Sequence, residues 1–295
     1  MHDEAIRDVV VIGAGTMGHG IAHVAAAAGC QVFLLDVDPG AVQAGLARVE
    51  AHLARGVELG KVTDAQRRDT LSRLRGGTEP AERVPGADLI IEAVPEDLDL
   101  KIRVLSEVGG LVGDTALVAT NTSSLPLSSM SRAVPAPERF IGLHFFNPPH
   151  RMRLVEIVVA EQTSAATTDT ACALVARFGK EAIVVRDSPG FATSRLGLII
   201  GLEAMRMVES GVASVADIDR AMELGYNHPM GPLKLSDLVG LDVRLGISET
   251  LARELDEVRF RPPAILRDKV RAGHLGKKTG EGFYRWTDDG PRPVD

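Results

Sequence analysis

Short apolar runs alternate with helical patterns along the first part of the chain. The apolar runs, each bounded by turn residues, lie at residues 8–12, 31–36, 87–94, 115–124, 139–146, 153–160 and 181–188. Helical patterns occupy residues 20–29, 40–59 and about 64–74, and another runs through Glu107. Buried strands that alternate with helices build βαβ units, whose strands run parallel. We therefore predict an α/β domain of the Rossmann type, with a doubly wound, mostly parallel sheet.

The pattern changes at Ser188. Helical segments are then predicted at residues 191–210, 214–223, 232–239, 241–256 and 263–272, and glycine and proline signals separate them. No convincing strand pattern appears until the last residues of the chain. We therefore predict two domains, the α/β domain at residues 1–188 and an all-helical C-terminal domain at residues 189–295.

A glycine-rich motif, GAGTMG at residues 13–18, fits the pattern G-x-G-x-x-G. It follows the first strand directly and opens a helix, which is the context that a dinucleotide site requires. Gly13 permits the tight turn, Gly15 lets the backbone approach a pyrophosphate, and Gly18 lets the helix pack on the strand. The helix N-terminus then attracts the phosphates. The residues predicted to contact the nucleotide here are Gly13, Gly15, Thr16, Met17 and Gly18.

Asp36 closes the second apolar run, where a carboxylate accepts hydrogen bonds from ribose hydroxyls and repels a 2′-phosphate. This residue favours NAD over NADP. Two alternatives stay open at this point: FAD, which shares the glycine pattern, and a structural strand-turn-helix that holds no ligand.

His144 lies near the end of the apolar run at residues 139–146, which leads into Asn147 and two prolines. Glu156 interrupts the run at residues 153–160. Ligands of a doubly wound sheet bind beyond the carboxyl ends of its strands, where His144 is expected. A carboxylate in a buried strand is costly unless something pairs with it. A carboxylate on one imidazole nitrogen raises the basicity of the other, so the pair predicts a general base beside the nicotinamide. The alternative is a core histidine that is satisfied by the backbone.

The segment at residues 121–124, NTSS, ends another strand at the same expected edge. Its hydroxyls can meet a polar substrate, or they can cap the next helix.

Composition and charge exclude several other classes of protein. The net charge of −7 argues against general nucleic-acid binding. Two cysteines without a CxxC pair exclude a disulfide framework and a thiolate zinc site. No signal peptide or apolar run of about 20 residues is visible, so we expect no membrane partner and a cytoplasmic location.

Two histidines, His19 and His23, are one helical turn apart and could share a metal ion. With no third ligand evident nearby, the sequence favours ordinary packing or surface roles, and we predict no metal site.

Several longer motifs together resemble the L-3-hydroxyacyl-CoA dehydrogenases, most of all the short-chain 3-hydroxybutyryl-CoA type. They run through nearly the whole chain and read VIGAGTMGHGIA, ADLIIEAVPEDLDLK, TNTSSL, HFFNP, LVEIV, DSPGF, GYNHPMGPLKLSDLVGLD and GKKTGEGFY. The resemblance implies NAD-dependent oxidation of an L-3-hydroxyacyl-CoA to the 3-ketoacyl-CoA, and the reverse reduction. It also implies a homodimer built largely through the second domain.

The resemblance assigns roles around the substrate. By it, His144 is the catalytic base and Glu156 its partner, while Ser123 hydrogen-bonds the substrate near its hydroxyl and Asn147 helps to order the site. Where the family commonly has an asparagine after PGF, this chain has Ser194, which is shorter and lacks the paired donor and acceptor of an amide. Ser194 stays a candidate for substrate binding.

Three further positions are assigned by the same resemblance. Glu96 and Lys101 match positions near the nicotinamide ribose, and Lys61 resembles a lysine that reaches the CoA phosphates. A solvated lysine at a helix end is the alternative for Lys61.

Two other functions remain open from the sequence. One is a dehydrogenase of a free hydroxy acid such as gulonate, which would keep the fold and the His144–Glu156 pair. The other is a non-enzymatic NAD-binding sensor or a structural protein like a crystallin. Intact Ser123, His144 and Glu156 favour an enzyme.

Overall fold

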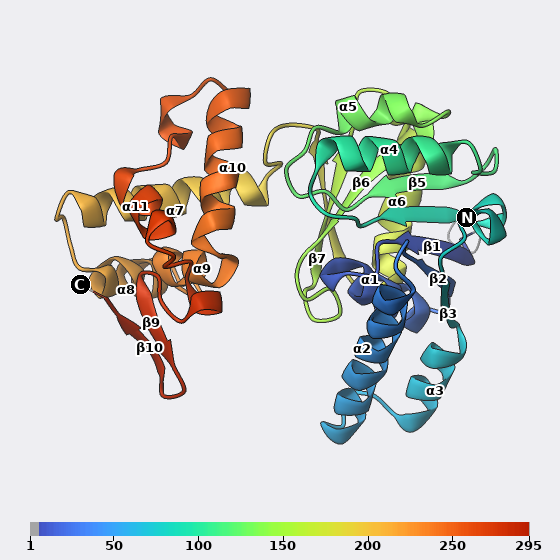
Figure 1. Ribbon diagram of the computed structural model, residues 1–295, viewed down its shortest axis with the longest axis horizontal. Coiled ribbons are helices and arrows are strands. Elements are labelled where there is room, and N and C mark those ends of the chain that lie inside the picture. Colours follow the sequence, from blue (N-terminus) through green and yellow to red (C-terminus); the bar gives the residue numbers. More distant parts are fainter. Residues whose placement is uncertain (1–5, 295) are drawn as a thin grey trace. The chain divides into compact units, whose positions relative to one another are not determined.

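The computed structural model describes residues 6–294 (Figure 1). The chain divides into two compact units, residues 1–188 and 189–295. No helix among the described residues is long and apolar enough to cross a membrane.

The first unit is built on one eight-stranded sheet with the strand order β3-β2-β1-β4-β5-β6-β7-β8. Its strands are β1 Asp8–Ile12, β2 Gln31–Leu35, β3 Leu74–Gly77, β4 Leu89–Glu92, β5 Leu117–Thr120, β6 Phe140–Phe145, β7 Leu154–Val159 and β8 Glu181–Arg186. Neighbouring strands run parallel except β6 and β7. This confirms the predicted fold class, a doubly wound and mostly parallel sheet.

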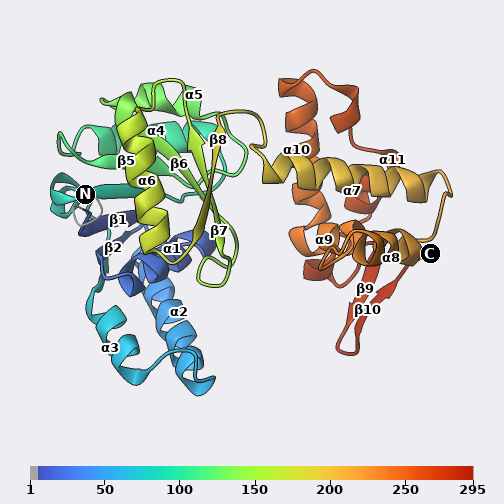
Figure 2. The ribbon, with the colours of Figure 1, turned by 180° about the vertical axis from the view of Figure 1, so that it is seen from behind.

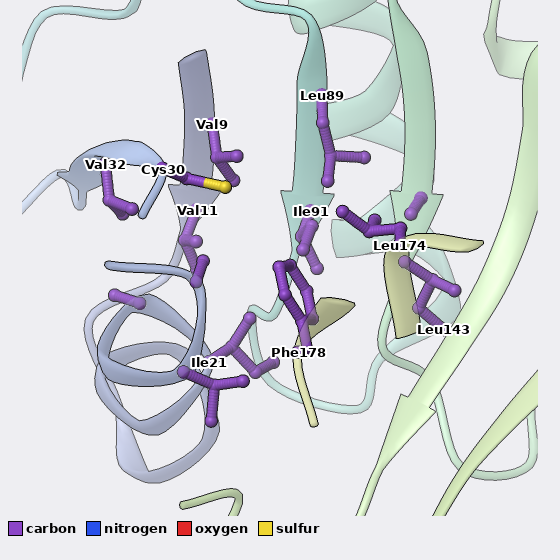
Figure 3. Packing of buried hydrophobic residues seen from close by; sticks show 14 of the residues in the cluster. Val9, Val11, Ile21, Cys30, Val32, Leu89, Ile91, Leu143, Leu174 and Phe178 are labelled. Atoms are coloured by element: carbon purple, nitrogen blue, oxygen red, sulfur yellow. The ribbon is translucent and has the colours of Figure 1, made fainter. Parts of the chain in front are cut away.

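Helices cover both faces of this sheet, as the two opposite views in Figures 1 and 2 show for α4 and α6. They are α1 Thr16–Ala27, α2 Pro39–Glu58, α3 Asp64–Ser72, α4 Leu98–Gly109, α5 Leu127–Met130 and α6 Ala165–Arg177. Figure 3 shows one side of the core, where Ile21 of α1 and Leu174 of α6 pack against strand residues such as Val11 and Ile91. The burial of β1, β2 and β4 to β7 explains their continuous apolar runs, whereas β8 at the end of the sheet is largely exposed.

Strand β3 was missed by the sequence pattern, which continued a helix to about residue 74. Its sequence, LRGG, shows no alternation, and it exists because it pairs with β2. A Cβ at Gly76 would lie 2.5 Å from Val42 Cγ1 on α2, so glycine is required for this close packing. Helix α6 was not assigned from the sequence either.

The second unit contains five helices and a terminal hairpin among its described residues. The elements are α7 Thr193–Glu209, α8 Val215–Gly225, α9 Pro232–Val239, α10 Leu241–Glu254, α11 Ala264–Arg271, β9 Tyr284–Thr287 and β10 Gly290–Pro293. All five helices lie within two residues of their predicted bounds. The second unit is helical as predicted, except for the hairpin of β9 and β10. Buried Asp237 anchors this hairpin by accepting hydrogen bonds from the N–H groups of Phe283 and Tyr284.

Candidate active site

The turn after β1 is shaped by its glycines. Gly13 has a φ of +100°, and a Cβ there would lie 2.7 Å from the carbonyl oxygen of Ala93. A Cβ at Gly18 would lie 1.7 Å from the Gly13 carbonyl oxygen, so only glycine lets α1 pack on the turn. Gly15 differs, because no atom that could obstruct a Cβ lies within 4 Å of that position. The space beside Gly15 is therefore open to a ligand that approaches the backbone.

The N-terminus of α1 and Asp36 complete a nucleotide site. No side chain caps α1 and no acidic residue lies in its first turn, so its first N–H groups and its positive end suit an anion. The Asp36 carboxylate at the end of β2 accepts a 2.7 Å hydrogen bond from the Ala14 N–H. This bond holds the carboxylate beside the glycine turn, at the place where a ribose binds in such folds.

A buried charge network lies where β4 and α4 meet. The Lys101 ammonium donates to Glu92 Oε1 at 2.8 Å and lies 3.5 Å from Glu96 Oε2. Glu92 also accepts hydrogen bonds from the Thr120 hydroxyl at 2.6 Å and the Val94 N–H at 2.7 Å. Because these buried charges are paired and hydrogen-bonded, the network can hold Glu96 in one position.

Glu96 in turn holds the segment that follows β5. Its Oε1 atom accepts hydrogen bonds from the Thr122 hydroxyl at 2.7 Å, the Ser123 N–H at 2.8 Å and the Ser123 hydroxyl at 3.0 Å. Burial alone would raise the pKa of Glu96, but the charge of Lys101 and these hydrogen bonds outweigh it, and the pKa lies below its ordinary value. An ionised Glu96 therefore fixes Ser123.

His144 and Glu156 lie directly opposite each other in the antiparallel register of β6 and β7. The ring Nδ1 atom is 2.7 Å from Glu156 Oε2, and the two side chains are 8% and 0% exposed. A carboxylate at Nδ1 favours the tautomer that carries its proton there, which makes Nε2 the basic atom. The Phe146 ring packs against the imidazole, with 4.5 Å between the ring centroids.

A pocket of about 830 Å³ joins the glycine turn to His144. It lies in the first unit at the carboxyl ends of β1, β2, β4, β5 and β6, the edge where open α/β sheets bind ligands. The predicted site residues that line it are Gly13, Gly15, Thr16, Met17, Asp36, Glu96, Ser123, His144 and Asn147. Leu100, Val104 and Phe146 add apolar surface.

The remaining predicted residues lie elsewhere. Gly18, Lys101 and Glu156 are buried and do not line the pocket, but each contacts a residue that does. Lys61 lies in the exposed turn after α2, and Ser194 is half-buried in the first turn of α7 in the second unit. Neither of these two lines the pocket.

Two polar residues of the site were given no role of their own from the sequence, although Asn121 lies in the predicted segment at residues 121–124. Glu92 is the buried anchor of Lys101, and Asn121 accepts the Phe145 N–H at 2.9 Å, which fixes the end of β6 next to His144. Glu92 could have been found, because it is a carboxylate in the apolar run at residues 87–94, the signal that identified Glu156.

The sequence suggested no third ligand near His19 and His23, but the structure brings two more histidines close to His23. His52 and His150 approach His23, and the three could hold a metal ion. His19 is engaged differently, because its Nδ1 lies 2.7 Å from the Gly15 carbonyl oxygen.

Comparison with known families shows to which family the chain belongs. Residues 8–188 match the family model of the 3-hydroxyacyl-CoA dehydrogenase NAD binding domain, and residues 190–286 match that of the C-terminal domain. The chain belongs to the 3-hydroxyacyl-CoA dehydrogenase family. It is an NAD-dependent oxidoreductase, and the open glycine turn, the uncapped helix N-terminus and Asp36 fit NAD as its cofactor.

Individual relatives of this dehydrogenase are similar over nearly the whole chain. A probable 3-hydroxybutyryl-CoA dehydrogenase of Bacillus subtilis is 42% identical over 279 residues, which are 95% of this chain and 97% of the relative. The 3-hydroxybutyryl-CoA dehydrogenase of Bradyrhizobium diazoefficiens is 40% identical, with 98% of both chains covered. The crystal structure of (S)-3-hydroxybutyryl-CoA dehydrogenase from Ralstonia eutropha superposes with a TM-score of 0.93 at 40% identity, covering 96% of this chain and 100% of the other.

Proposed function

We propose that this dehydrogenase oxidises a short-chain L-3-hydroxyacyl-CoA, 3-hydroxybutyryl-CoA foremost, to the 3-ketoacyl-CoA, and catalyses the reverse reduction. The observation that carries the proposal is the His144–Glu156 pair, with His144 lining the same pocket as the glycine turn. The relatives named 3-hydroxybutyryl-CoA dehydrogenase support the choice of substrate.

In this proposal, His144 is the general base. Its Nε2 atom takes the proton of the substrate hydroxyl, and bound NAD supplies the hydride acceptor. Glu156 keeps the proton on Nδ1 and stabilises the imidazolium that forms, because an ionised carboxylate 2.7 Å away favours the charged ring. In the reduction, the same imidazolium returns the proton to the keto oxygen.

The polar residues around His144 are proposed to orient the substrate. The Ser123 hydroxyl lies at the pocket, held through Glu96, and can donate to the substrate oxygen. Asn147 follows β6 and lines the same pocket, where it helps to order the site. Lys101 and Glu96 act on the cofactor side, with Lys101 working through its ion pairs.

The two units are proposed to have different functions. Residues 1–188 bind NAD, while residues 189–295 supply substrate contacts, with Ser194 as a candidate, and the surface of a homodimer. Lys61 is proposed to reach the CoA phosphates from the exposed turn after α2.

The test is to mix the purified protein with NADH and follow the loss of NADH absorbance with acetoacetyl-CoA and, separately, with free acetoacetate. Oxidation of NADH with the thioester but not with the free acid is the expected result. Turnover with the free acid alone would identify a hydroxy-acid dehydrogenase instead. Binding of NADH without turnover of either compound would contradict the enzymatic proposal.

A further inference from the structure

Three histidines from distant parts of the sequence meet in the first unit, and none of them lines the nucleotide pocket or takes part in the proposed reaction. His23 lies on α1, His52 on α2 and His150 in the turn between β6 and β7. One ring nitrogen of each lies within 4.8 Å of the other two. The ring centroids of His52 and His150 are 4.4 Å apart, and those of His23 and His150 are 5.5 Å apart. We call these three residues the histidine cluster.

The buried nitrogens of the cluster lack partners. The Nδ1 atoms of His23, His52 and His150 are all buried, and none has a hydrogen-bond partner within residues 6–294. Buried polar atoms are nearly always hydrogen-bonded, so three unpaired ring nitrogens in one cluster call for an explanation. A ligand that accepts electron pairs from several imidazoles at once would provide it.

The histidine rings and the charged side chains near them indicate what kind of ligand the cluster can bind. Burial, reinforced by the neighbouring imidazoles, lowers the pKa of His23 and that of His150 to about 4. An uncharged imidazole ring donates an electron pair to a metal ion and does not attract an anion. Lys180 and Arg151 lie near enough to act on the cluster, and their charges oppose a cation that is held by electrostatics alone. The cluster therefore fits only an ion that forms strong bonds to imidazole nitrogen. Mg²⁺ and Ca²⁺ prefer oxygen ligands and form no such bonds.

We propose that His23, His52 and His150 bind one divalent transition-metal ion, Zn²⁺ or a similar ion, which cross-links α1, α2 and the turn after β6. Zn–N bonds of about 2.0–2.1 Å in tetrahedral geometry place ligand nitrogens about 3.3 Å apart. The ring nitrogens lie within 4.8 Å of one another, so metal binding must shorten these N–N distances by at most about 1.5 Å. A cavity of about 340 Å³ borders His23 and His150 and leaves room for water as a fourth ligand.

The three linked segments all lead to the nucleotide pocket. Helix α1 begins at the glycine turn, α2 follows Asp36 closely, and the turn that carries His150 follows Asn147. A metal ion in the cluster therefore fixes these three pocket segments to one another, and it should raise the thermal stability of the protein.

The experiment uses full-length protein without a histidine tag, stripped with a chelator and dialysed. It is titrated at neutral pH with ZnCl₂ by calorimetry and with CoCl₂ by visible absorption, which reports the coordination of Co²⁺. We expect one ion per chain and a rise in the unfolding temperature. His52→Gln and His150→Gln should each weaken binding by more than about 100-fold, because even residues that only orient ligands contribute about 10–100-fold.

His228→Gln, which removes a histidine of the second unit, is the matched control and should bind as the unchanged protein does. Circular dichroism and NADH binding show whether each variant folds. Absence of Zn²⁺ and Co²⁺ binding by the folded protein would overturn the proposal. Metal binding that survives both cluster substitutions would overturn it too, since the ion would then sit elsewhere, for instance at His144 and Glu156.

Discussion

Replacing Glu156 by glutamine removes one charge from the proposed catalytic pair and nearly preserves its shape. The carboxylate lies 2.7 Å from His144 Nδ1 and is fully buried. At an effective dielectric constant of about 20, opposite charges about 4 Å apart attract by about 4 kcal/mol. Loss of this attraction in the transition state, where His144 becomes charged, corresponds to about a thousandfold in rate.

The assay is steady-state reduction of acetoacetyl-CoA by Glu156→Gln. We expect kcat to fall by about 10²–10³-fold, with unchanged affinity for NADH, because Glu156 does not line the pocket. Glu181→Gln is the matched control: Glu181 is 69% exposed on β8 in an ion pair with Arg153, and such pairs contribute little. A folded Glu156→Gln enzyme with the kcat of the unchanged protein would refute the proposed role of the pair.

Three other predictions concern Gly15 and Gly18, Glu96, and Ser194. Gly15→Ala should weaken NADH binding without loss of stability, because its Cβ enters open space beside the nucleotide, whereas Gly18→Ala should destabilise the fold by its clash with the Gly13 carbonyl. Thermal melts and NADH titrations of both variants check this. A Gly18→Ala protein as stable as the unchanged one would contradict it. Glu96 has a lowered pKa in the folded protein, so the stability it contributes is complete above its ordinary value of 4.5 and is lost as the pH falls through the folded-state pKa. The difference in unfolding free energy between the unchanged protein and Glu96→Gln should therefore shrink as denaturant titrations move from neutral to acidic pH, and a difference that grows would count against the ion pairs of Glu96. Ser194→Asn should keep substantial activity with acetoacetyl-CoA, since the family resemblance places an asparagine at this position, and complete inactivation would show that the position is not permissive.

The fold was predictable because most of its elements carry their own periodicity. The buried strands read as apolar runs, and the helices of the second unit end at glycine and proline signals. Strand β3 was not predictable in this way, because LRGG becomes a strand only by pairing with β2. The hairpin at the end of the chain likewise depends on Asp237, which lies in a helix distant in sequence.

The site was predictable where it follows from strand ends. The glycine turn, Asp36 and His144 all lie at the carboxyl ends of strands, which topology brings to one edge of the sheet. The pairing of His144 with Glu156 was expected, but its antiparallel register was not, because the direction of β7 is set by the turn that precedes it.

The histidine cluster could not be predicted from the sequence. His23, His52 and His150 belong to two helices and a turn, and no spacing pattern relates them. Only the packing of α2 and of the turn after β6 against α1 brings the three rings together.

In the proposed reaction, His144 accepts the hydroxyl proton of an L-3-hydroxyacyl-CoA in a pocket that also holds NAD. The most direct measurement is the rate at which His144→Gln oxidises L-3-hydroxybutyryl-CoA at saturating NAD, together with its affinity for NADH. We expect a rate at least about 100-fold below that of the unchanged protein, with NADH binding retained. A folded variant that oxidises this substrate at the unchanged rate would contradict it.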